Sequence, residues 1–144
     1  MEALATNRRC CSDRKGISQQ AFHIRERIRA VDDLLTPALQ AKVREGHPEV
    51  TFAVMNGGRP MKHHKRTPEG LAERLTILAA FGVNGFDPIA ARAHLGKSRV
   101  EIDDIVDAVA MLVTAKRIVE GRATAFPDGP ACLDDRGLEM RIWA

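Results

Sequence analysis

The chain has 144 residues and a formal net charge of +3, which suits one domain of ordinary size. Apolar residues make up 44% of the sequence, enough for a real core, so wholesale disorder is excluded. A positive charge this small permits contact with nucleic acid without requiring it. No apolar run approaches the roughly 18 residues of a membrane span, so we expect no membrane association.

Residues 1–16 are polar and basic without apolar periodicity, and we expect a flexible N-terminal segment there, followed by one domain over 17–144. The segment lacks the apolar centre of a signal peptide. The three cysteines, Cys10, Cys11 and Cys132, show no metal-binding spacing. Together these features predict a cytoplasmic protein with free thiols.

Several stretches have the apolar spacing of helices. Residues 17–35 carry an apolar stripe at three- and four-residue steps, with Ser18 as a cap and Thr36-Pro37 as a stop. Further helices are expected over residues 50–55, from Thr67-Pro68 to Gly82, and from Asp87-Pro88 to about residue 95.

The stretch 103–121 predicts the central helix of the core. Asp103 is a plausible N-cap and Gly121 a plausible left-handed stop. Residues 109–113 are apolar on every face, so we expect this helix to be buried on all sides. Asp104 and Asp107 lie three residues apart near its start. Two carboxylates there either cap the helix or hold a metal ion.

Two short strands complete the expected elements, at residues 41–45 and 138–143, where apolar and polar residues alternate. Two strands so far apart in sequence do not make a stable sheet by themselves. Either they pair beneath the helices, or another chain or a second copy supplies further strands. The basic loop Lys62–Arg66 either contacts phosphates or is a solvated loop.

The ordered motifs resemble a family of uncharacterised proteins expected to have an RNase H-like nuclease fold. The two most specific are Glu45-x-His47-Pro48-Glu49-Val50-x-Phe52 and Lys65-x-Thr67-x-x-Gly70-x-x-x-Arg74. The others are Gly16-Ile17-Ser18-Gln19-Gln20-Ala21-Phe22, Asn56-Gly57-Gly58, Asp103-Asp104-x-x-Asp107-Ala108 and Asp135-Arg136-Gly137-Leu138-x-Met140-x-Ile142-Trp143. The resemblance covers the C-terminal half to two thirds of a complete member, without the first strands.

The resemblance implies an α/β fold class: a mostly helical fragment of an RNase H-like fold with two short strands. It also implies hydrolysis of nucleic acid with Mg²⁺ or Mn²⁺, in which Glu45, Asp104 and Asp107 are the catalytic carboxylates and metal ligands. Glu45 and Asp104 have plainer interpretations, as a surface acid beside Arg44 and as a helix-start charge. Asp107 lies one turn deeper, where burying an unpaired acid is costly, so we expect it to have a partner or a metal. Because the first catalytic strand is missing, the chain is expected to be incomplete as a catalyst.

The same resemblance makes Lys65, Arg74 and His47 the expected substrate-binding residues. For His47, a hydrogen bond to a backbone carbonyl at the turn is the competing interpretation. An alternative function of a different class is a non-catalytic remnant or nucleic-acid-binding module that uses the basic loop. A binding module needs only a contiguous basic face, and its affinity falls steeply with salt.

Overall fold

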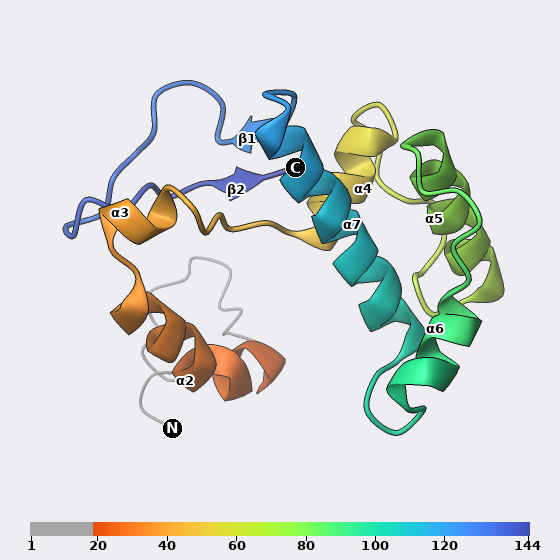
Figure 1. The fold of residues 1–144 in the computed structure, drawn as a ribbon. Helices are drawn as coiled ribbons and strands as arrows, with labels where there is room; N and C mark the ends of the chain where they lie inside the picture. The colour runs from red at the N-terminus through yellow and green to blue at the C-terminus, as the bar shows by residue number, and fades with distance from the viewer. Residues whose placement is uncertain (1–18) are drawn as a thin grey trace.

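The computed structural model describes residues 19–144, which are mostly helical with a small antiparallel sheet (Figure 1). The helices are α2 (Gln19–Leu34), α3 (Pro37–Gln40), α4 (Pro48–Met55), α5 (Pro68–Ala80), α6 (Pro88–Leu95) and α7 (Ile102–Val119), and the strands are β1 (Ala125–Phe126) and β2 (Ile142–Trp143). The expected mostly helical α/β class with two short strands is confirmed. The expected flexible segment 1–16 and the Ser18 cap lie outside the described residues.

Local sequence sets the starts of four helices. Proline stands in the first turn of α3, α4, α5 and α6, where its fixed φ suits the helix and its missing N–H costs nothing. The side chains of Thr36, Thr67 and Asp87 accept hydrogen bonds from backbone N–H groups of the following turn. The expected helix starts at Thr67-Pro68 and Asp87-Pro88 are therefore confirmed.

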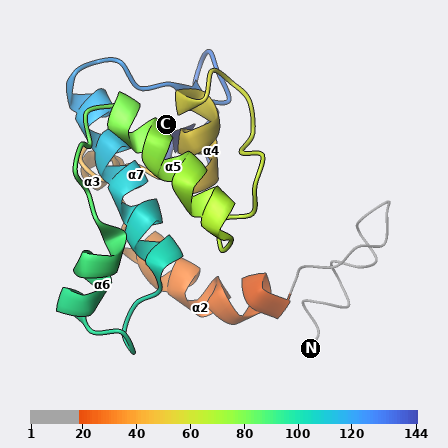
Figure 2. The same cartoon turned by 90° about the vertical axis from the view of Figure 1, so that its right-hand side faces the viewer.

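The core lies where α4, α5 and α6 pack against α7 (Figures 1 and 2). Phe52 from α4, Leu78 from α5 and Ala110 from α7 are all 0% exposed and meet in one cluster. Burying a side chain the size of Phe or Leu contributes about 1.5–3 kcal/mol. The expected central position of α7 is confirmed.

The expectation that α7 is buried on all sides is wrong. Leu112 is 66% exposed and Val119 is 87% exposed, because the other helices cover only part of its circumference. The expected N-cap is also wrong: Glu101 is the cap residue, and it forms a capping box with Asp104. Gly121 follows the helix with φ +66°, the left-handed conformation expected of a stop.

The sheet is smaller than the sequence pattern predicts. Residues 41–45 form no strand, and their neighbour Gly46 makes only a single parallel bridge to Trp143. The predicted strand 138–143 is reduced to β2: Glu139 makes only an isolated antiparallel bridge to Leu133, and its backbone N–H and carbonyl bond to the side chain of Gln40. The partner of β2 is β1, which the sequence pattern does not mark.

Helix α2 lies apart from the bundle of α4 to α7 (Figure 1). Arg136 tethers its end, donating 2.8 Å hydrogen bonds to the carboxylate of Asp32 and the carbonyl of Leu35. The predicted apolar stripe of this helix is exposed, with Ile28 at 58% and Val31 at 56%. None of the helices in residues 19–144 combines the length and hydropathy needed to cross a bilayer.

Candidate functional site

Four charged residues meet where the basic loop reaches the first turns of α7. The Nζ atom of Lys65 lies 2.6 Å from Oδ2 of Asp107 and 3.4 Å from Oδ2 of Asp103. Arg66 Nε donates a 3.1 Å hydrogen bond to the same oxygen of Asp103. Asp103 and Asp107 are four residues apart and so face the same side of the helix. We refer to these four residues as the Lys65 cluster.

The contacts of the cluster shift the pKa values of Asp103 and Lys65 toward their charged forms. Burial raises the pKa of Asp103, but the Arg66 hydrogen bond and the nearby charges outweigh that effect, so its pKa lies below the ordinary value. The pKa of Lys65 is raised, chiefly by its hydrogen bond to Asp107. Two cations therefore face two carboxylates, and the local charge cancels.

One buried oxygen atom of the cluster has no hydrogen-bond partner. Oδ1 of Asp107 is buried without a hydrogen-bond partner, whereas Oδ2 accepts from Lys65. A buried carboxylate oxygen without a donor costs free energy and is uncommon in folded proteins. The Asp107 side chain as a whole is 17% exposed, whereas this oxygen itself is buried.

Asp104 points elsewhere on the helix. It is exposed, and its Oδ2 accepts a 3.3 Å hydrogen bond from the backbone N–H of Glu101. Glu101 in turn pairs with Arg92 at 2.8 Å. The capping interpretation of Asp104 accounts for these contacts, and its expected role as a metal ligand stays a prediction.

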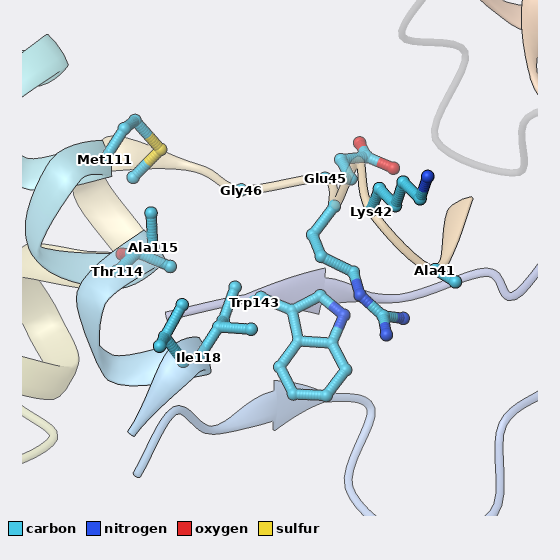
Figure 3. Close-up of a pocket in the computed structure, with 11 residues that line it drawn as sticks. Ala41, Lys42, Glu45, Gly46, Met111, Thr114, Ala115, Ile118 and Trp143 are labelled. Atoms are coloured by element: carbon cyan, nitrogen blue, oxygen red, sulfur yellow. The ribbon is translucent and has the colours of Figure 1, made fainter. Parts of the chain in front are cut away.

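Glu45 lies in the segment that passes the C-terminal half of α7. Its backbone carbonyl accepts a 2.8 Å hydrogen bond from the N–H of Trp143. It borders a groove of about 330 Å³, whose other walls include Met111, Ile118 and Trp143 (Figure 3). Among residues 19–144, no three His, Cys, Asp or Glu side chains come close enough together to hold a metal ion. The described residues therefore do not assemble Glu45, Asp104 and Asp107 into one metal site.

Arg74 is buried in a set of interactions internal to the fold. The residue is 3% exposed, and its Nη2 donates to both carboxylate oxygens of Glu49 at 2.7 and 2.9 Å. Its Nη1 donates to the carbonyls of His63 and Gly70. This geometry gives no support to the expected substrate contact, because the guanidinium faces protein groups; it fixes the basic loop instead.

The basic loop is thus held rather than loosely solvated. The carboxylate of Glu73 accepts 3.0 Å hydrogen bonds from the backbone N–H groups of Lys62 and His63, and the Lys62 hydrogen bond is the first cause of its lowered pKa. This anchoring on α5 places Lys65 against α7. His47 is exposed and occupies the N-cap position of α4 without a side-chain capping hydrogen bond.

Sequence reasoning missed Asp103 and Arg66 as members of the cluster. The sequence pattern suggests Asp103 as the helix cap, although its four-residue spacing from Asp107 is a signal for a shared face. The cost of burying an unpaired acid predicts a partner or a metal at Asp107, and Lys65 is such a partner. The pairing of Glu49 with Arg74 was also missed, since it joins two motifs distant in sequence.

The comparisons with known proteins give one match. No curated protein and no solved structure matches the chain. A family model described as "Protein of unknown function (DUF429)" matches residues 1–131, which include the Lys65 cluster and all six residues expected from the resemblance. The chain therefore belongs to the DUF429 family, a family whose description assigns no function.

Proposed function

We propose that the chain is a nuclease-like protein of RNase H-like type, which contributes part of a metal-dependent site for phosphodiester hydrolysis in nucleic acid. The observation that supports this proposal is the carboxylate of Asp107. One of its oxygens accepts a hydrogen bond from the Lys65 ammonium, and the other is buried without a hydrogen-bond partner. In this proposal the acid pair Asp103 and Asp107 is the part of the site that the chain itself supplies.

A divalent metal fits the described residues only in part. Catalysis of this class uses ions held between several carboxylates, and residues 19–144 bring no three ligands together. The unpartnered Oδ1 of Asp107 fits the role of one ligand to the metal. The remaining carboxylates, including the predicted ligands Glu45 and Asp104, would need strands of a partner chain or a second copy to complete the site. The chain by itself is therefore proposed to be incomplete as a catalyst.

Lys65 has two roles in this proposal. Its ammonium neutralises Asp103 and Asp107 together, and its partial exposure leaves it able to contact a phosphate. Arg74 serves indirectly, because it holds the carbonyl of His63 and thereby the loop that carries Lys65. His47 remains a predicted contact to the substrate.

The first experiment is a Mn²⁺ titration of the full chain, following free ion by electron paramagnetic resonance. We expect weak saturable binding that Asp107→Asn abolishes. Asp128→Asn is the matched control, since Asp128 is exposed and its Oδ1 only accepts from the neighbouring Gly129 N–H. Absence of saturable binding, or equal binding in both variants, would overturn the nuclease-like proposal.

A nucleic-acid-binding module is the second candidate, because Arg59 and Lys62 of the same region are exposed. Lys65 and Arg66 weigh against it, since their charges are directed at Asp103 and Asp107. Fluorescence anisotropy with labelled single strands, repeated over a salt series, separates the two functions.

A binding module should retain affinity in Asp107→Asn and without divalent metal. If the chain is a binding module, Lys62→Ala should weaken binding to all nucleic-acid sequences. It should also reduce the slope of log affinity against log salt concentration by about one. Lys97→Ala is the matched control, because Lys97 is also exposed but lies after α6. Retained, metal-independent binding of this kind would favour the module over the nuclease-like site.

A further inference from the structure

Two helices of the chain present apolar faces to solvent. On α2, the exposed apolar side chains are Ile24 at 41%, Ile28 at 58%, Val31 at 56% and Leu34 at 73%. On α7, they are Ala108, Leu112, Ala115 and Val119. Contiguous apolar surface of this kind commonly marks an interaction site.

The α7 face continues into the groove beside it. Ala115 and Val119 line that groove together with Met111, Ile118 and Trp143 (Figure 3). The groove therefore widens the apolar surface along one side of α7. A partner that covers α7 here must be apolar, elongated and about as long as the exposed stripe.

The α2 stripe has that length and spacing. Its positions 24, 28 and 31 repeat the steps of positions 108, 112 and 115 on α7, and Leu34 and Val119 end the two exposed faces. From first to last residue, the two faces span ten and eleven residue steps, about 15 and 16 Å of helix. Side chains at such steps can interdigitate along two parallel or antiparallel helices.

Within one chain, α2 is held away from α7. Arg136 fixes its C-terminal end through Asp32 and the Leu35 carbonyl, and α2 lies apart from the α4–α7 bundle (Figure 1). A second copy can meet both exposed faces without breaking this tether. A two-fold axis would then bring the α2 of each copy to the α7 of the other, so that the same helix contact forms twice and covers all four apolar faces.

We propose that this chain forms a symmetric dimer in which α2 of each copy packs in parallel on the exposed face of α7 of the other. The charges select the parallel direction. In the first part of α2, Arg25 pairs with Glu26 and Arg27 is exposed, and at the start of α7 the exposed Asp104 lies one turn before Ala108 on the same face. At the other ends, Asp33 of α2 faces the basic last turn of α7, whereas antiparallel packing would place arginines beside that basic turn.

Sedimentation velocity of the full chain tests the dimer. We expect the wild type to sediment as a dimer, and Ile28→Asp and Leu112→Asp each to give a monomer, because either carboxylate would be buried without a partner. Leu133→Asp is the matched control: Leu133 is 57% exposed but belongs to neither helix. A monomeric wild type, or a dimer unaffected by both helix variants, would overturn the proposal.

Disulfide cross-linking tests the partner and the direction. Single-cysteine variants are prepared with Cys10, Cys11 and Cys132 replaced by serine, purified separately, mixed and oxidised. Ile24→Cys mixed with Ala108→Cys should give a dimer-sized band, and Ile24→Cys alone should not. Ile24→Cys mixed with Val119→Cys is the directional control and should stay uncross-linked. A band only in that control mixture, or no band in either mixture, would refute the parallel exchange.

Discussion

Arg74 is the residue whose removal should most clearly expose how the site is held. Its guanidinium donates to two oxygens of Glu49 and to the carbonyls of His63 and Gly70, and it lies 5.3 Å from the ring centre of Phe52. Arg74→Ala removes all of these contacts and leaves the His63 carbonyl without a donor, while the Gly70 carbonyl keeps its acceptor place in the α5 backbone ladder. Breaking a buried ion pair costs about 3–5 kcal/mol.

The partner carboxylate is 42% exposed, so the ion-pair part of that cost is reduced by solvent. Adding the lost carbonyl hydrogen bonds, we expect Arg74→Ala to lower the free energy of unfolding by about 3 kcal/mol. Urea unfolding followed by circular dichroism measures it. With a slope of about 1–3 kcal/mol per molar urea, the midpoint should fall by about 1–3 M.

Glu49→Gln is the matched control, because it keeps the shape and an acceptor oxygen while removing the partly exposed charge. We expect it to cost about 1 kcal/mol. If Arg74→Ala cost no more than Glu49→Gln, the loop carbonyls would not be held by Arg74. The account of how Lys65 is brought to α7 would then fail.

Three further predictions concern stability. The buried hydroxyl groups of Thr51 and Thr114, whose residues are 0% and 4% exposed, share a 2.8 Å hydrogen bond. Thr51→Val should lower the free energy of unfolding by about 1–3 kcal/mol. In a urea double-mutant cycle, the variant with valine at both positions should lose less than the two single variants added together. The lowered pKa of Asp103 means that its contribution is full above pH 3.8 and lost as pH falls through the folded pKa. The difference in unfolding free energy between wild type and Asp103→Asn should therefore shrink only in strong acid, and a difference independent of pH would contradict the ion pairing. A Cβ added at Gly70 would lie 2.0 Å from the backbone carbonyl oxygen of His64, whereas a Cβ added at Gly46 would lie 2.9 Å from the sulfur of Met111, whose side chain can move. Gly70→Ala should therefore cost about 3 kcal/mol or more and Gly46→Ala about 1 kcal/mol, measured by thermal melting.

The local chemistry of the chain was sufficient to predict most helix ends. A capping side chain, a proline in the first turn or a glycine with positive φ acts within one turn of the backbone, so these signals at Thr67, Asp87 and Gly121 do not depend on distant residues. The central place of α7 followed from its apolar content. The mostly helical class also followed, whereas of the two predicted strands only part of 138–143 is present.

Only the tertiary structure decided which acids act together. One residue step turns a helical side chain by about 100°, so Asp103 and Asp107 share Lys65 while Asp104, between them in sequence, caps the helix. Which face of α7 stays exposed also depended on how α4, α5 and α6 pack. These contacts join residues tens of positions apart, and no local pattern specifies them; the sheet partners and the burial of Arg74 were hidden from the sequence for the same reason.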